Sequence, residues 1–177
     1  MAEPAEFSTF VRTHSTGLLR SAFLLTGNRV DAEELVQDTL VRLYPQWARV
    51  LAAEIPLAYV RRSLTNNYLN GRRRRSASDL LFAVLPEREH GYEPDHGDRL
   101  GDRELVRGLL AGLPARQRAV LVLRFLDDLD DGEIAEIVGC RRGTVRSIVS
   151  RGLQQLRIDI DRRPAEAETR QTNGNLR

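Results

Sequence analysis

The sequence predicts an all-α protein in which two small helical domains are joined by a flexible acidic linker. Apolar residues recur at helical spacing along most of the chain, as in the series Ala32, Leu35, Val36 and Thr39. Residues 76–102 interrupt this pattern with Pro, Gly and an excess of acidic side chains, and a loop this long is unusual inside one compact domain. A chain of 177 residues fits one domain or two small ones. We therefore expect a first domain over 1–75, a linker over 76–102 and a second domain over 103–163.

The first helix is predicted over residues 7–25, where Phe and Leu side chains form one apolar stripe. Gly27 and Asn28 are expected to end it. His14 lies on the stripe, so we interpret it as a packed core histidine and not as a catalytic one.

The second helix is predicted to open at Asp31, with Glu34 completing a pattern that resembles a capping box. Its apolar stripe runs from Ala32 to Trp47. The opposite face carries polar and charged residues, namely Glu33, Glu34, Gln37, Asp38 and Arg42. Acids in a first turn complement the helix dipole, and a partner-binding face is the other interpretation.

Residues 48–55 are predicted to be a short connection before a third helix over 56–70, which begins with Pro56 and is ended by Gly71. Leu57, Val60, Leu64 and Tyr68 would face inward, whereas Arg61, Arg62, Thr65 and Asn66 would point more outward. Four arginines follow, Arg72, Arg73, Arg74 and Arg75. Four cations exceed what a helix dipole needs, so a phosphate-facing role is favoured.

The net charge of +2 hides a strong partition of charge along the chain. Residues 55–75 hold six Arg and no acid, whereas residues 76–102 hold two Arg and seven acids. Clustered Arg suits a polyanion, because each phosphate contact releases counterions. All 27 basic residues are Arg, and the bias of a GC-rich genome explains that choice.

The second domain is predicted to begin with a helix that places Leu105, Leu109 and Leu110 on one face. A helix over 115–126 follows and is apolar from Ala119 to Leu123, as expected for the centre of a small bundle. Part of the acidic corner Asp127, Asp128, Asp130 and Asp131 would then cap the next helix.

The segment from Ile134 to Ile148 has the layout of a helix-turn-helix. Ala135 is small where two helices would cross, and Gly139 lies where the turn favours a left-handed backbone. Cys140 is interpreted as a packing residue. The second helix of such a unit enters the DNA major groove with its N-terminal residues foremost, which here are Arg141, Arg142, Thr144, Arg146, Ser147, Ser150 and Arg151. Which arginine reads a base and which holds a phosphate stays open.

The composition excludes several classes of protein. One Cys excludes a disulfide framework and a multi-cysteine zinc site. No secretory signal or membrane-spanning segment is visible, so we expect a cytoplasmic protein. No glycine-rich phosphate loop is present, and the acidic corner lacks the spacing of a calcium loop. We therefore expect no enzyme activity, no metal and no cofactor.

Four passages resemble the bacterial sigma-70 family, in its extracytoplasmic-function (ECF) branch. LLRSAFLLTGNRVDAEELVQDTLVRLYPQW (18–47) is similar to the opening of the family's region 2, and PLAYVRRSLTNNYLNGRRRR (56–75) to its −10 segment. LLAGLPARQRAVLVLRF (109–125) is similar to the start of region 4, and DDGEIAEIVGCRRGTVRSIVSRGLQQLR (130–157) to its helix-turn-helix. The resemblance implies a sigma factor that binds core RNA polymerase, directs initiation at particular promoters and assists promoter melting.

The resemblance also implies a role for each surface. The −35 element would be read by the helix-turn-helix, and the clamp helices of the largest polymerase subunit would bind the residues Glu33, Glu34, Gln37, Asp38 and Arg42. The flap of the second-largest subunit and an anti-sigma factor are further candidate partners, and no membrane is expected. The −10 element would be bound by the loop 49–55 and the third helix, through Arg49, Tyr59, Arg61, Arg62, Asn66, Asn67, Arg72, Arg73, Arg74 and Arg75.

Three points in this assignment stay open. Thr65 stands where the family usually has Arg before Asn66, so contacts there are expected to differ. Tyr59 is interpreted equally well as a structural residue or as a stacking platform for an unpaired base. The linker would follow the polymerase's basic RNA path, or it is simply a soluble tether.

Two other hypotheses are an ordinary helix-turn-helix regulator that binds an operator as a dimer, and an enzyme. The regulator hypothesis leaves residues 72–75 and the acidic second helix without a role. The tail over 164–177 is predicted to be disordered.

Overall fold

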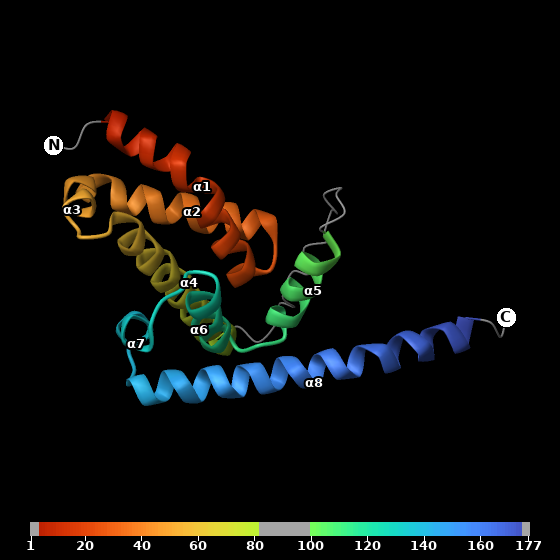
Figure 1. Ribbon diagram of the computed structural model, residues 1–177. Coiled ribbons are helices and arrows are strands. Elements are labelled where there is room, and N and C mark those ends of the chain that lie inside the picture. The colour runs from red at the N-terminus through yellow and green to blue at the C-terminus, as the bar shows by residue number, and fades with distance from the viewer. Residues whose placement is uncertain (1–3, 82–99, 175–177) are drawn as a thin grey trace.

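The computed structural model confirms an all-α protein. It describes the backbone of residues 4–81 and 100–174, and the side chains of residues 5–73 and 104–162. Every regular element within those ranges is helical: α1 (Pro4–Thr26), α2 (Arg29–Leu43), the short 3-10 helix η1 (Tyr44–Gln46), α3 (Trp47–Leu51), α4 (Pro56–Leu81), α5 (Leu100–Ala111), α6 (Ala115–Phe125), α7 (Asp131–Val138) and α8 (Arg142–Gly174) (Figure 1). None of these helices is both long and apolar enough to cross a membrane.

The first domain is a bundle in which α2 and α4 pack beside α1 (Figure 1). Its core contains Leu18, Val36, Trp47 and Leu64, all buried. The stripe predicted for the second helix is confirmed, because Ala32, Val36, Thr39, Leu40, Leu43 and Trp47 are buried and Leu35 is half-buried. His14 is half-buried and lies against the ring of Phe10, in keeping with a packing role.

The second domain places α6 at its centre, with α7 and α8 packed against it. Residues 119–123 of α6 are all buried, as the sequence predicted. The core between α6, α7 and α8 contains Leu123, Ile134 and Val145, which are fully buried. The far end of α8 extends beyond the bundle (Figure 1).

The two domains pack against each other. Leu25 and Tyr68 of the first domain share one buried cluster with Leu110, Leu113 and Leu121 of the second. Helix α1 contacts α5 and α6, and α4 contacts α6 and α7. Two halves that the sequence predicted as joined only by a tether therefore form a continuous apolar interface.

The cap of α2 differs from the prediction. Asn28, and not Asp31, is the N-cap: its side-chain oxygen accepts a hydrogen bond from the Asp31 amide at 2.8 Å. Its amide nitrogen also donates to the Asp31 carboxylate at 2.8 Å. Asn and Asp are equally good caps, and Gly27, with φ of 87°, turns the chain so that the helix begins one turn earlier.

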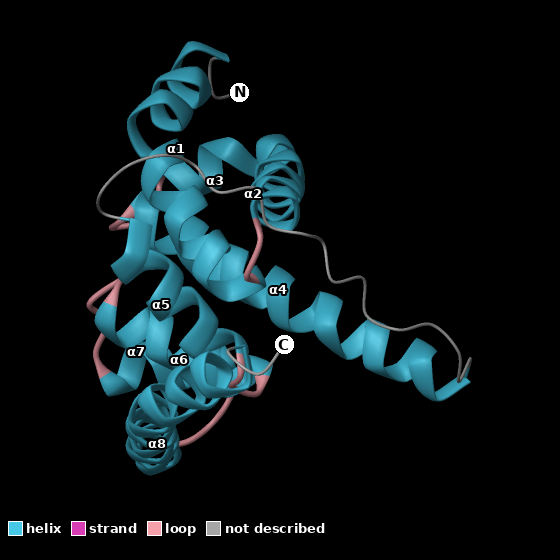
Figure 2. Cartoon of the chain, turned by 90° about the vertical axis from the view of Figure 1, so that its right-hand side faces the viewer, coloured by secondary structure: helices cyan, strands magenta, loops and turns pink. Residues whose placement is uncertain are grey.

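The predicted connection over 48–55 is confirmed only for residues 52–55, and the predicted stop at Gly71 was wrong. Residues Trp47–Leu51 form α3, because Trp47 and Val50 are buried against the first core. Helix α4 continues through Gly71 and the arginine run to Leu81. A helical Gly costs only about 1 kcal/mol relative to Ala, and Gly71 does not have the positive φ of a helix stop. Figure 2 shows this second half of α4 extending away from the bundle.

The linker and the tail were predicted from composition. Residues 82–99 of the linker lie outside the described residues, whereas 76–81 belong to α4 and 100–102 to α5. Helix α8 continues through Gly174 across the tail that was predicted to be disordered. Ala and Glu are good helix formers and follow Pro164 in this stretch.

Candidate nucleic-acid interface

Helices α7 and α8 form the predicted helix-turn-helix. Gly139 has φ of 64° and ψ of 58°, the left-handed conformation that the sequence required there. The Cys140 amide donates to the Ala135 carbonyl at 2.9 Å, which closes the turn. Arg116 of α6 donates to the Val138 carbonyl at 3.0 Å and so ties the turn to the bundle. The start of α8 is therefore held in a fixed direction.

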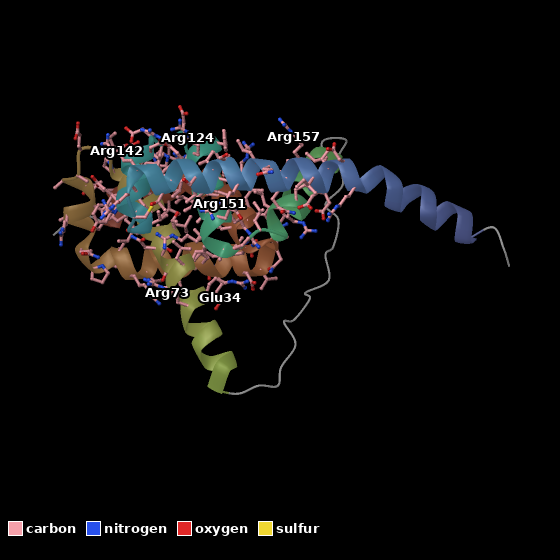
Figure 3. All side chains as sticks on the ribbon, turned by 90° about the horizontal axis from the view of Figure 1, so that it is seen from below. Glu34, Arg73, Arg124, Arg142, Arg151 and Arg157 are labelled. Carbon is pink, nitrogen blue, oxygen red and sulfur yellow. The ribbon has the colours of Figure 1, made fainter. Side chains whose placement is uncertain are left out.

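The predicted recognition residues share one property, which is exposure. Val145 and Ile148 face inward and are buried. All seven candidates are exposed, namely Arg141, which directly precedes α8, and Arg142, Thr144, Arg146, Ser147, Ser150 and Arg151 of α8. Figure 3 shows Arg142, Arg151 and Arg157 spaced along this helix. The structure thus brings together basic and hydroxyl side chains on one exposed surface, and side chains of these types can hydrogen-bond to phosphates and base edges.

The start of α7 carries acids beside these arginines. Asp130 is the N-cap in a complete capping box with Glu133. The backbone amides of Glu133 and Gly132 donate to its carboxylate and hold the pKa of Asp130 below its ordinary value. The next residue, Asp131, lies 3.0 Å from Nε of Arg146. Two acids of the acidic corner therefore have different roles, since Asp130 caps α7 and Asp131 contacts α8.

The candidate −10 residues of α4 do not all face solvent. Nε of Arg61 lies 3.2 Å from Oδ1 of Asp127 in the second domain, and Arg62 lies 3.6 Å from Glu136. Thr65, expected to point outward, is buried. The structure therefore turns this part of α4 toward the second domain, which sequence periodicity could not predict.

The remaining candidates around α4 fall into separate groups. Asn66 is half-buried, and Asn67 donates to Thr39 of α2 at 3.2 Å. Tyr59 is half-buried against the first core, which favours its structural interpretation. Arg49 on α3 and Arg73 on α4 are exposed, and Arg72 is half-buried. The backbones of Arg74 and Arg75 continue α4, but their side chains lie outside the described residues.

Asp127 is the charged centre of the contact between the domains. Its side chain is 2% exposed and accepts a hydrogen bond from Oγ of Ser21 at 3.1 Å. Burial raises the pKa of Asp127, while the nearby Arg61 and the Ser21 hydroxyl oppose that rise. The sequence had assigned Asp127 only to an acidic corner.

A buried arginine also joins the domains and was missed. Arg118 of α6 donates to the carbonyls of Leu25 at 2.7 Å, Ala111 at 2.8 Å and Leu113 at 3.2 Å. Arg107 of α5 donates to the Gly27 carbonyl at 3.0 Å. These guanidinium groups satisfy carbonyls at helix ends, which otherwise lack partners. One indication of this role was present in the sequence, because Arg118 directly precedes the apolar run Ala119 to Leu123.

The candidate partner face of α2 is largely open. Glu34, Gln37 and Asp38 are exposed, and Arg42 lies 4.0 Å from Asp38. Glu33 forms an ion pair with Arg29 at 2.8 Å.

A cleft of about 220 Å³ separates this face of α2 from α4, and Asp31, Glu34, Asp38, Asn67 and Asn70 are among the residues that line it. Figure 3 shows Glu34 and Arg73 on the same side of the molecule. No group of His, Cys, Asp or Glu in the described part of the chain is arranged to hold a metal ion.

Comparison with known proteins is consistent across sequence and structure. Residues 10–78 match the family Sigma-70 region 2, and residues 109–157 match Sigma-70, region 4. The chain is 35% identical over 176 residues to the RNA polymerase sigma-E factor of Streptomyces coelicolor, covering 97% of this chain and 98% of that protein. It is 33% identical to the ECF RNA polymerase sigma factor SigE of Mycolicibacterium smegmatis, covering 88% of this chain and 62% of that protein.

Two solved structures share the arrangement of helices. The sigma factor RpoE of Bartonella quintana, in complex with the anti-sigma factor NepR, matches with a TM-score of 0.69 and 26% identity, covering 88% of this chain and 97% of that one. CnrH, in complex with the cytosolic domain of CnrY, matches with a TM-score of 0.60 and 21% identity, covering 90% of each chain. The second match supports the fold alone.

Proposed function

The chain belongs to the sigma-70 family, in its ECF branch, and from this premise we propose that it directs core RNA polymerase by reading a −35 element with α8 and a −10 element with α4. The family membership makes it a transcription initiation factor. The observation that carries the −35 proposal is the exposure of all seven candidate residues at the start of α8.

The −35 element is the DNA site proposed for α8. Its first two turns enter the major groove, since Val145 and Ile148 fix the opposite side of the helix in the core. Arginines pair with guanine edges or phosphates, and the hydroxyls of Ser147 and Ser150 accept or donate at the backbone. The exposure of these side chains at the start of α8 supports the proposed position of the helix in the major groove.

The −10 element is assigned to α4 and the chain that precedes it. Arg61 and Arg62 bind the DNA backbone in this proposal, and the arginine run from Arg72 adds charge along the same helix. The turn over 52–55 after α3 receives a flipped base and so assists melting, because a protein pocket has to offset the few kcal/mol that unstacking costs. Arg61 and Arg62 must first separate from Asp127 and Glu136, so the domains open before DNA binds.

The exposed acids of α2 are proposed to bind the clamp helices of core polymerase. Glu34 and Asp38 lie one helical turn apart on an exposed face, and a basic partner helix would neutralise them. An anti-sigma factor is proposed as a second partner, supported by the relative from Bartonella quintana that was solved in such a complex. We place the protein in the cytoplasm with the polymerase.

Transcription from a promoter library with core polymerase tests the proposed function. The full chain should produce initiation at a small set of promoters, and absence of promoter-specific starts contradicts it. Arg142→Ala and Arg146→Ala should each lower use of promoters that depend on the −35 element by about tenfold, since one good base contact contributes roughly 1–3 kcal/mol. Arg157→Ala, on an exposed residue later in the same helix, is the matched control.

Binding to core polymerase tests the α2 face separately. The variant Glu34→Arg with Asp38→Arg should weaken association while the helical content stays unchanged. Asp161→Arg is the control, because it reverses an exposed acid far along α8. Equal association of all three proteins with core polymerase would exclude this face.

A further inference from the structure

The N-terminus of α7 lies directly against two of the recognition arginines. Oδ2 of Asp131 accepts from Nε of Arg146 at 3.0 Å. The guanidinium of Arg142 lies so close to Gly132 that a Cβ on that residue would come within 2.6 Å of Nη2. Figure 3 shows Arg142 and Arg124 along this edge of the second domain. The first turn of α7 therefore faces the first two turns of α8 through these side chains.

Asp131 is the fixed member of its pair. Its side chain is 23% exposed, whereas that of Arg146 is 72% exposed. Nη1 of Arg124 lies 3.8 Å from the other carboxylate oxygen of Asp131 and donates to the Leu129 carbonyl at 3.0 Å. A partly buried carboxylate that lies between two cations has less freedom than the exposed Arg146, so we take it as the member that determines where the Arg146 guanidinium lies.

This pair contributes little to stability. Exposed ion pairs stabilise a fold only weakly, because water screens the charges. An unpaired exposed arginine, however, loses much side-chain rotamer entropy when it is fixed on binding. Fixing Arg146 before DNA binds removes part of that cost. The contact uses Nε, so the guanidinium N–H groups on the side away from Asp131 remain available to the edge of a base.

The charge of Asp131 decides which DNA atoms suit Arg146. A carboxylate beside a DNA phosphate is repelled, and a paired arginine has little net charge to offer a phosphate. A guanine edge accepts two hydrogen bonds without bringing a full negative charge. The pair thus favours a base over the DNA backbone as the target of Arg146.

Gly132 has no backbone reason to be glycine. Its φ does not lie in the left-handed region, unlike those of Gly27 and Gly139. Glycine inside a helix is less favourable than alanine. Because Gly132 has no side chain, the Arg142 guanidinium can occupy the space beside it. A methyl group there would displace this flexible end without clashing with backbone.

We propose that Asp131 and Gly132 are positioning residues for −35 recognition: Asp131 directs Arg146 onto a guanine edge, and Gly132 leaves room for the Arg142 guanidinium. The proposal rests on the function proposed above. It distinguishes Arg146, which pairs with Asp131, and Arg142, whose guanidinium lies against Gly132, from the other arginines of this surface. Arg141 and Arg151 form no ion pair with an acid of the described residues.

The test is initiation by the full chain with core polymerase on promoters in which each −35 position carries each of the four bases. Asp131→Asn should lower the preference for guanine at one position by about fivefold to tenfold, at the same position that Arg146→Ala affects. Asp131→Glu should restore part of that preference. Gly132→Ala should alter preference at the position that depends on Arg142. The unfolding midpoint of each Asp131 variant should stay near that of the wild type.

Asp128→Asn is the matched control. It removes the same charge from the same corner, and Asp128 forms no ion pair with the described arginines. Its φ of 55° is one that Asn tolerates well. If Asp131→Asn leaves every base preference unchanged, or if Asp128→Asn has the same effect, the inference fails. If the wild type shows no −35 dependence, or if Arg146→Ala has no effect, the proposed −35 function of α8 fails instead.

Discussion

The contact between the two domains should depend on one buried carboxylate. Changing Asp127 to Ala leaves the Arg61 guanidinium and the Ser21 hydroxyl facing an interface without their shared partner. Removing one member of a buried ion pair typically costs about 3–5 kcal/mol. Because the Arg61 side chain is 25% exposed and can regain some water, we expect the lower end of that range, about 3 kcal/mol. Asp127→Asn keeps an acceptor for Ser21 and should cost about 1–2 kcal/mol.

Urea unfolding measures this effect with two independent signals. Trp47 is the single tryptophan and is buried in the first domain, so its fluorescence reports that domain. Far-ultraviolet circular dichroism reports the helices of both domains. If the interface couples the domains, Asp127→Ala, a change in the second domain, should also lower the midpoint seen by Trp47.

A double-mutant cycle with Arg61→Met isolates the pair itself. We expect a coupling energy above about 1 kcal/mol, since residues that share an ion pair show coupling of roughly 0.5–3 kcal/mol. Asp128→Asn is the control for charge removal on the exposed side of the same corner. A coupling energy near zero, or a Trp47 signal that ignores Asp127→Ala, would refute the reasoning.

Three further measurements test neighbouring features. Burial raises the folded-state pKa of Asp127. The stabilisation that this shift gives the folded state should be fully present below the ordinary Asp pKa, and it should be lost as pH rises through the raised value. Urea unfolding across that pH window should show this loss of free energy in the wild type and not in Asp127→Asn. Arg118→Met leaves three carbonyls without their donor and should lower the free energy of unfolding by about 3–5 kcal/mol, with Arg118→Lys in between. Gly139→Ala should cost about 1–2 kcal/mol through its left-handed backbone alone, since nothing lies within 4 Å of the added Cβ, and Gly139→Asn should cost less in the same assay.

Local features of the site were predictable from the sequence. The turn at Gly139, the buried Ala135 and Val145, and the exposed face of α8 follow from spacing within about twenty residues. The capping role of the acidic corner was also predicted, although the structure was needed to assign it to Asp130. Helix boundaries were less predictable. Gly71 was expected to end α4 and lies inside it, and Pro164, the first residue of the tail predicted to be disordered, lies inside α8.

The contacts between domains were not predictable in the same way. Arg61 and Arg62 are neighbours in sequence and were both expected to point outward, yet Arg61 is largely covered and Arg62 is not. Their difference comes from Asp127 and Glu136, which lie beyond the linker. Ser21 and Asp127 are separated by 106 positions, and no periodicity connects residues at that distance.

The sequence by itself determined the all-α class, the family, the helix-turn-helix and the partition of charge, because each depends on residue type and local spacing. Only the tertiary structure decided which charged side chains are covered. Asp127 pairs with Arg61, Arg118 joins the ends of α1 and α5, and Asp131 pairs with Arg146. These contacts depend on how helices pack across a long separation in the chain. Packing fixes burial, and burial decides whether an ionic side chain binds a partner within the protein or meets solvent and DNA.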